Sequence, residues 1–165
     1  MASQLPVSGV VLASEMTGEN EVETVRLRRM EAEARAFLTA FKWCGSILEF
    51  YFGDGLGDVF AIFLARIEPW GAGVDEYLWV IVGDLPPVYL VVDDCRTPKA
   101  ALHGYIAEMR KWIAAVEDNG NLNSVIPVNV PATPESAKAL KSRLDCLEHE
   151  LIPAWWPGED NVQPE

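Results

Sequence analysis

Four apolar segments follow one another in the middle of the chain, and their short connections constrain the fold more than any other feature. They occupy residues 46–52, 58–68, 76–83 and 88–93. Aromatic and β-branched side chains, which are favoured in strands, are frequent in all four. A parallel crossover needs a dozen or more residues, and the connections here are shorter. The sequence therefore predicts a four-stranded antiparallel meander.

The first connection contains the run Gly53-Asp54-Gly55-Leu56-Gly57, which has a superficial likeness to a phosphate-binding loop. Such loops need a helix N-terminus directly after the glycines, whereas a strand is predicted here. Asp54 and Asp58 would also repel a phosphate. We interpret the run as a hairpin turn.

The two central segments are almost continuously apolar, reading FAIFLA and YLWVIV. A strand with one face in solvent alternates apolar and polar residues, so a continuous run predicts burial on both faces. We expect helices of this chain, or a partner, to cover the sheet on both sides.

An amphipathic helix is predicted before the strands, over residues 20–43. Its apolar side chains recur at intervals of three and four, as a helix facing a core requires. They are Leu27, Met30, Ala34, Phe37 and Phe41. We expect the helix to end at Cys44-Gly45, with Gly45 in a left-handed cap.

Two further helices are predicted after the strands. Each begins with a Thr-Pro pair, Thr97-Pro98 and Thr133-Pro134, in which threonine caps the helix and proline occupies its first turn. The first ends near residues 119–120, and the second should end before Pro153. The expected fold class is α+β: an antiparallel four-stranded meander with one N-terminal and two C-terminal helices.

The composition supports a single folded domain over residues 1–165. Half of the residues are hydrophobic and 23% are charged, which excludes general disorder. Residues 1–18 and 157–165 lack periodicity, and we expect them to be mobile ends. No apolar run reaches the ~18 residues of a membrane helix, and three widely spaced cysteines give no disulfide framework. We therefore expect a soluble, cytoplasmic protein of bacterial type.

The chain is strongly acidic, with a formal net charge of −12. Nucleic-acid binding depends on lysine and arginine, so this charge argues against a nucleic-acid partner. Residues 53–94 contain eight acidic residues and one basic residue, Arg66. In a meander, alternate loops meet at the same end of the sheet. One end should therefore gather Glu68, Trp70, Asp75, Glu76, Asp93 and Asp94.

No catalytic constellation is predicted. Cys95 precedes a helix that also carries His103, but the two should lie roughly 10 Å apart, too far for proton transfer, and Cys95 is interpreted as a buried residue. The acidic strand ends could hold a divalent cation, yet no metal-binding spacing occurs, so we expect no metal and no cofactor. Trp43, Trp79 and Trp112 are expected in the core, whereas Trp70 and the pair Trp155-Trp156 are candidates for exposure.

The leading hypothesis is a non-enzymatic interaction protein, resembling immunity proteins and inhibitors as a class, whose acidic sheet end binds a basic protein. An alternative is an enzyme or small-ligand-binding protein that uses these carboxylates with a divalent metal, or an aromatic pocket. A second alternative is a structural homodimer without a ligand.

Overall fold

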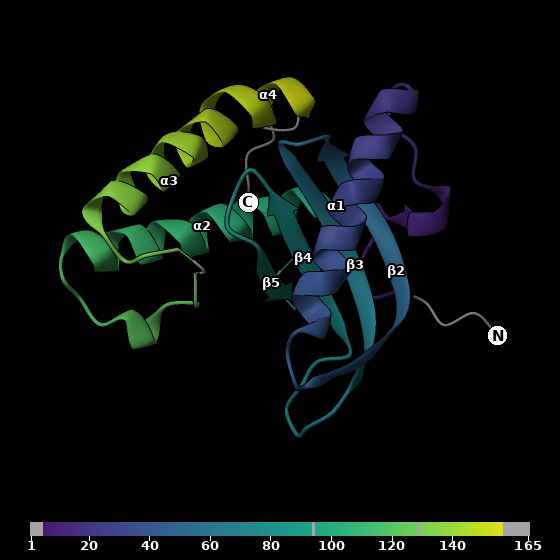
Figure 1. Ribbon diagram of the computed structural model, residues 1–165, viewed down its shortest axis with the longest axis horizontal. Helices are drawn as coiled ribbons and strands as arrows, with labels where there is room; N and C mark the ends of the chain where they lie inside the picture. The colour runs from purple at the N-terminus through teal and green to yellow at the C-terminus, as the bar shows by residue number, and fades with distance from the viewer. Residues whose placement is uncertain (1–4, 94, 129, 157–165) are drawn as a thin grey trace, which may run out of the picture. The chain divides into compact units, whose positions relative to one another are not determined.

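The computed structural model describes residues 5–93, 95–128 and 130–156 (Figure 1). The chain divides into two compact units, Met1–Tyr105 and Ile106–Glu165. The first unit holds the sheet and the second is helical, and helix α2 begins in the first and ends in the second. Within the described residues, no helix is both long and apolar enough to cross a membrane.

The sheet is antiparallel, and its strands lie in the order in which they occur along the chain. The predicted meander is therefore confirmed. Its strands are β1 (Val11–Leu12), β2 (Cys44–Leu56), β3 (Phe60–Pro69), β4 (Tyr77–Gly83) and β5 (Val88–Val91).

The prediction of four strands was wrong by one, because β1 lies in the segment that we expected to be a mobile end. Val11 pairs with Phe52 and Leu12 pairs with Tyr51 at the outer edge of β2. Two residues are too few to show the alternation by which a strand is identified in sequence. The pairing partner, rather than a local pattern, defines β1.

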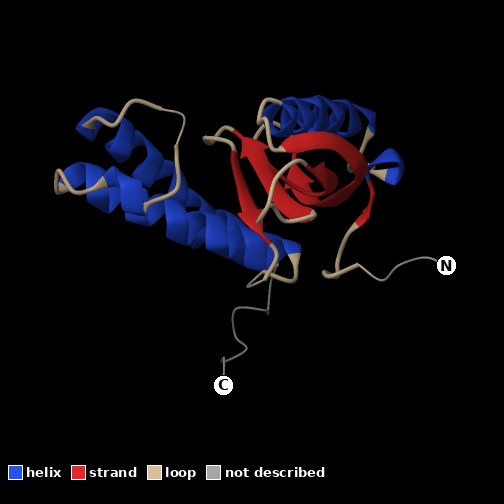
Figure 2. Cartoon of the chain, turned by 90° about the horizontal axis from the view of Figure 1, so that it is seen from below, coloured by secondary structure: helices blue, strands red, loops and turns tan. Residues whose placement is uncertain are grey.

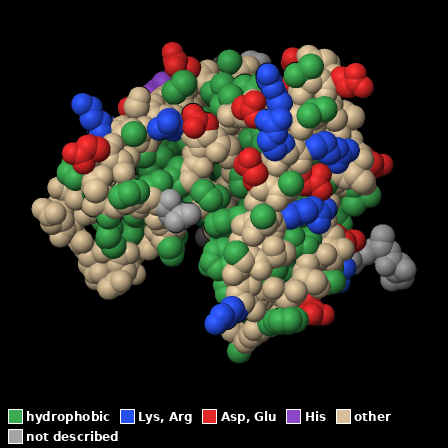
Figure 3. Space-filling model, in the orientation of Figure 1, with side chains coloured by type: hydrophobic (Ala, Val, Ile, Leu, Met, Phe, Trp, Pro, Cys, Tyr) green, Lys and Arg blue, Asp and Glu red, His purple; other side chains and the backbone are tan. Residues whose placement is uncertain are grey.

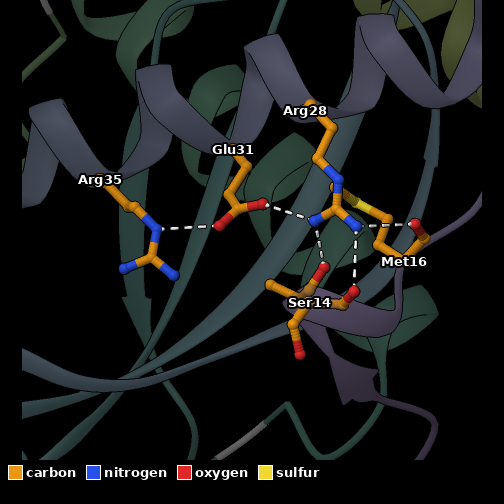
Figure 4. Close-up of polar contacts among 6 residues, drawn as sticks. Ser14, Met16, Arg28, Glu31 and Arg35 are labelled. Carbon is orange, nitrogen blue, oxygen red and sulfur yellow. Dashed lines mark hydrogen bonds and ion pairs between the residues drawn. The ribbon is translucent and has the colours of Figure 1, made fainter.

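A single arginine on α1 (Glu21–Thr39) holds the segment that follows β1. The Arg28 guanidinium donates hydrogen bonds to the carbonyl oxygens of Ala13, Ser14 and Met16, at 2.5, 3.0 and 3.2 Å (Figure 4). The short 3₁₀ helix η1 (Ala13–Glu15) lies within this segment, and Ala13 and Met16 are buried. Arg28 also pairs with Glu31 at 3.1 Å, which fixes the direction of its side chain.

Helix α1 lies along one side of the curved sheet (Figure 2). Asn20 caps it by accepting a hydrogen bond from the backbone N–H of Glu23. The apolar stripe of α1 packs in one cluster with inward-facing side chains of β2, β3 and β4. The helix ends at Thr39, four residues before its predicted end, and Gly45 lies in β2 without a positive φ. The prediction of a left-handed cap at Gly45 was therefore wrong.

Both faces of β3 and β4 are buried within the chain, as their continuous apolar runs predicted. On the face of Phe63 the strands meet α1. On the opposite face, the indole N–H of Trp79 donates to the carbonyl oxygen of Cys95 at 2.7 Å, and the Tyr105 hydroxyl donates to that of Pro86 at 2.8 Å. Buried polar groups need such partners, so these bonds permit both large side chains to be enclosed.

The helical unit contains the end of α2 (Pro98–Glu117) and the segments that follow it. These are η2 (Leu122–Ser124), α3 (Pro134–Cys146), the π-helical segment η3 (Leu147–Leu151) and α4 (Ile152–Trp155). The two predicted threonine caps are present, because Thr97 and Thr133 accept hydrogen bonds from the backbone N–H groups of Ala100 and Ser136.

The last predicted helix boundary was wrong, because helical backbone continues beyond Pro153 to Trp155. Proline lacks the N–H that an α-helix would use, and the π-helical segment η3 ends two residues before it. Within the same unit, Arg110 of α2 donates to Asp145 of α3 at 3.0 Å and to Glu148 at 2.6 Å. These bonds connect α2 to α3.

Candidate functional site

The antiparallel strand order brings the predicted site residues to one end of the sheet. Cys44 at the start of β2 pairs with Pro69 at the end of β3, and Leu78 near the start of β4 pairs with Val91 at the end of β5. The segments next to these pairs must lie at the same end. We call the charged and aromatic residues there the acidic rim: Glu68, Trp70, Asp75, Glu76 and Asp93.

One rim carboxylate is already paired within the sheet. Arg66 of β3 donates to Glu76 at 2.5 Å and to Glu49 of β2 at 3.2 Å. Hydrogen bonds to Glu76 and to Glu49 raise the pKa of the Arg66 guanidinium, so it is a fixed positive charge. Glu76 is therefore partly neutralised, and less of its charge is available to a partner.

Trp70 is the most exposed large apolar side chain of the rim, with 64% of its surface accessible. Its indole N–H donates to the Glu68 carboxylate at 2.7 Å. The ring lies against the backbone at Gly45, where a Cβ atom would collide with it. A glycine in β2 thus lets the indole rest on the sheet while most of its surface faces solvent.

The exit from β5 supplies the last part of the rim. Asp93 is exposed, and its carbonyl oxygen accepts a hydrogen bond from Arg96 at 3.4 Å. The predicted site residue Asp94 lies outside the described residues. Cys95 is buried, in agreement with its interpretation as a packed side chain.

A pocket of about 320 Å³ opens beside Asp75. Its lining comprises Trp43, Gly73, Val74, Asp75, Leu78, Tyr89 and Val91. Asp75 is the one charged residue in this lining, and among the described residues it makes no ion pair. Most of the pocket wall is therefore apolar or aromatic, with one carboxylate that is not neutralised.

The two aromatic rings that line this pocket, Trp43 and Tyr89, belong to a cluster of four with Phe37 and Phe41. Phe41 stacks on Trp43 with centroids 4.9 Å apart, and Tyr89 meets Trp43 edge-on at the same distance. Phe37 contacts both Phe41 and Tyr89. Because one face of the Trp43 indole is covered by Phe41, only its other face and its edge are available to the pocket.

The prediction that Trp43 belongs to the core was only partly right. Trp79 and Trp112 are buried, but Trp43 is half-buried and lines the pocket. Trp155 and Trp156 are half-buried as well. Strand order places Trp43 and the end of β5 at the same end of the sheet as Trp70, but the early end of α1, which the sequence did not signal, brings Trp43 against Tyr89.

The opposite end of the sheet, which we call the turn end, carries the β2–β3 and β4–β5 connections. Gly57 donates its N–H to the Glu23 carboxylate of α1 at 2.6 Å. Asp58 pairs with Arg26 at 3.3 Å and lies 3.9 Å from Arg29. Strand β3 follows this connection, as expected for a hairpin, so no helix begins directly after the glycines.

The surface of the sheet unit carries charged side chains of both signs (Figure 3). Acidic and basic side chains alternate over α1, and apolar side chains gather with charged ones at the end where the β3–β4 loop lies (Figure 3). Among the described residues, no three His, Cys, Asp or Glu side chains cluster as they would around a metal ion. None of the three cysteines forms a disulfide.

Compared with known proteins, the chain matches no family model, no curated protein and no solved structure.

Proposed function

We propose that the protein acts by binding, and that the acidic rim with Trp70 is the surface that meets a basic protein partner. The observation that carries this proposal is the placement of an exposed indole, several carboxylates and a pocket at the same end of the sheet. Aromatic side chains supply much of the binding energy of protein interfaces.

Charge is the second support. Asp75 and Asp93 are exposed and, among the described residues, make no ion pair, so they present negative charge to an approaching molecule. Complementary charge speeds association and rejects partners of the same sign. A small acidic protein with such a surface suits the inhibition of a basic protein, such as one that acts on nucleic acids.

A charge-reversal comparison tests this function. The variant Asp75→Lys/Asp93→Lys changes two rim positions, and Glu19→Lys/Glu33→Lys makes the same change in charge at exposed positions before and on α1. Each protein is immobilised and used to capture proteins from an extract of the source cell, at about 0.05 M and 0.5 M salt.

The expected result is one or more basic proteins that are retained by the wild type and by the α1 control but released by the rim variant. High salt should release them too, because it screens exposed charges. Equal capture by the wild type and the rim variant would refute the proposed surface.

A further inference from the structure

The pocket beside Asp75 has the composition of a site for a cationic group. Its aromatic lining, Trp43 and Tyr89, offers ring faces and edges, and Asp75 supplies a carboxylate at the same opening. A cation over an aromatic ring is attracted by the electrons of the ring face, most strongly for tryptophan. An adjacent carboxylate adds a charge-assisted hydrogen bond.

The volume of the pocket indicates how large a ligand it can hold. A volume of about 320 Å³ lies at the lower end of the roughly 300–1,000 Å³ typical of small-molecule sites. Such a space suits one long side chain better than an extended ligand. Asp75 in its lining, and Glu68 and Asp93 at the same end of the sheet, favour a positively charged side chain at the opening.

Resting on the proposed function, we infer that this pocket receives one arginine side chain of the basic partner. Arginine suits it better than lysine, because a planar guanidinium stacks on an aromatic ring and forks onto a carboxylate at the same time. Phe41 covers one face of the Trp43 indole, so a cation can approach only from the other side. A flat guanidinium fits this restricted approach better than a tetrahedral ammonium does. Trp70 and the rim carboxylates then contact the residues around that arginine.

Three synthetic peptides separate the pocket from the general charge of the rim. Each has lysines at both ends, and the central residue is arginine, lysine or the neutral isostere citrulline. Because the lysines are common to all three, the acidic rim attracts each peptide, and only the central residue reports on the pocket. Affinity is measured by fluorescence anisotropy of the labelled peptides at low salt.

The arginine peptide should bind about tenfold more tightly than the citrulline peptide, with the lysine peptide between them. Two variants should remove this discrimination. Asp75→Asn deletes the carboxylate, and Val91→Met fills the pocket from β5 without changing charge or adding a ring. Glu33→Gln, an equal loss of charge at an exposed position of α1, should leave it unchanged. Thermal melting of each variant verifies that it is folded.

The outcomes distinguish the two proposals. Equal, salt-sensitive binding of all three peptides, unaffected by Val91→Met, would overturn the arginine pocket and leave the acidic rim standing. Tight binding of the citrulline peptide alone would show a pocket for neutral groups and overturn the inference. Absence of binding by any peptide at low salt would overturn the inference and count against the rim as well.

Discussion

The two ends of the sheet both carry carboxylates, but they use them in different ways. At the turn end, Glu23 holds the backbone of Gly57, and Asp58 is paired with arginines of α1. At the rim end, Glu76 shares Arg66 with Glu49, whereas Asp75 faces an aromatic pocket. A carboxylate that forms contacts within the chain has little charge left for a partner. Aspartate and glutamate therefore stabilise the fold at the turn end, whereas at the rim end some of them are available for binding.

This comparison shows why total charge is a poor guide to a binding surface. The acidic residues between positions 53 and 94 are distributed over both ends. What distinguishes the structural end from the end that we propose binds a partner is the contacts that each carboxylate makes, rather than the number of carboxylates.

Two glycines should show the largest difference between the ends. Gly83, at the turn end, has a φ of +145° and its Cβ would collide with the backbone of Val59 and Phe60. Gly73, in the β3–β4 loop, has a φ of +80° but open space around it. We expect Gly83→Ala to lower the free energy of unfolding by about 3 kcal/mol, and Gly73→Ala by about 1 kcal/mol. Urea denaturation measures both; equal losses would contradict the comparison.

The contact of Glu23 with Gly57 should matter more for stability than the carboxylate of Asp75. Glu23→Ala removes an acceptor from a part-buried N–H, and a loss of about 1 kcal/mol is expected. Asp75→Asn at an exposed position should change the unfolding free energy by less than about 0.5 kcal/mol. Chemical denaturation again provides the measurement, and the opposite ranking would show that the rim end is the structural one.

The turn end should loosen at alkaline pH through Tyr105, whose hydroxyl holds Pro86. Burial raises the pKa of Tyr105, so the folded state retains its proton after the unfolded chain, with a tyrosine pKa of about 10, has lost it. This contribution to stability is complete below pH 10. Above it, the free energy of unfolding should fall by about 1.4 kcal/mol per pH unit until the folded-state pKa is reached.

Replacement of Tyr105 by phenylalanine should flatten this slope. Some slope should remain, because burial also raises the pKa of Tyr51 and of Cys44. Denaturation midpoints between about pH 9 and pH 11 provide the measurement. An unchanged slope in Tyr105→Phe would show that another group controls the alkaline transition.

A small effect on stability is also expected at Trp70. Since 64% of its surface is accessible, Trp70→Ala should cost about 0.5 kcal/mol, whereas the buried Trp79→Ala should cost roughly 3–5 kcal/mol. The thermal unfolding midpoints of the two variants measure this contrast. A loss at Trp70 as large as that at Trp79 would mean that the exposed indole is a structural element rather than a binding element.

The meander and its helices were predictable because each has a signal in consecutive residues. Short connections required antiparallel strands, and Thr97 and Thr133 marked two helix starts that the structure contains. The apolar runs of β3 and β4 likewise predicted burial on both faces.

The remaining features depend on contacts between distant residues. Strand β1 is defined by its pairing with β2. Helix α1 ends at Thr39, where no glycine marks the helix end in the sequence. Because the helix ends early, Phe41 and Trp43 leave it and pack with Tyr89. The acidic rim could be predicted from strand order, but the pocket beside it required this unexpected helix end.

The Arg28 contacts have a consequence for the exposed edge of the sheet. An unpaired strand edge is a template on which other chains add strands, and β2 is a 13-residue edge of which β1 covers only two positions. The segment after β1 is held by one guanidinium on three carbonyl oxygens. We therefore expect the loss of Arg28 to loosen β1 and to expose the strand edge at Tyr51 and Phe52 to other chains.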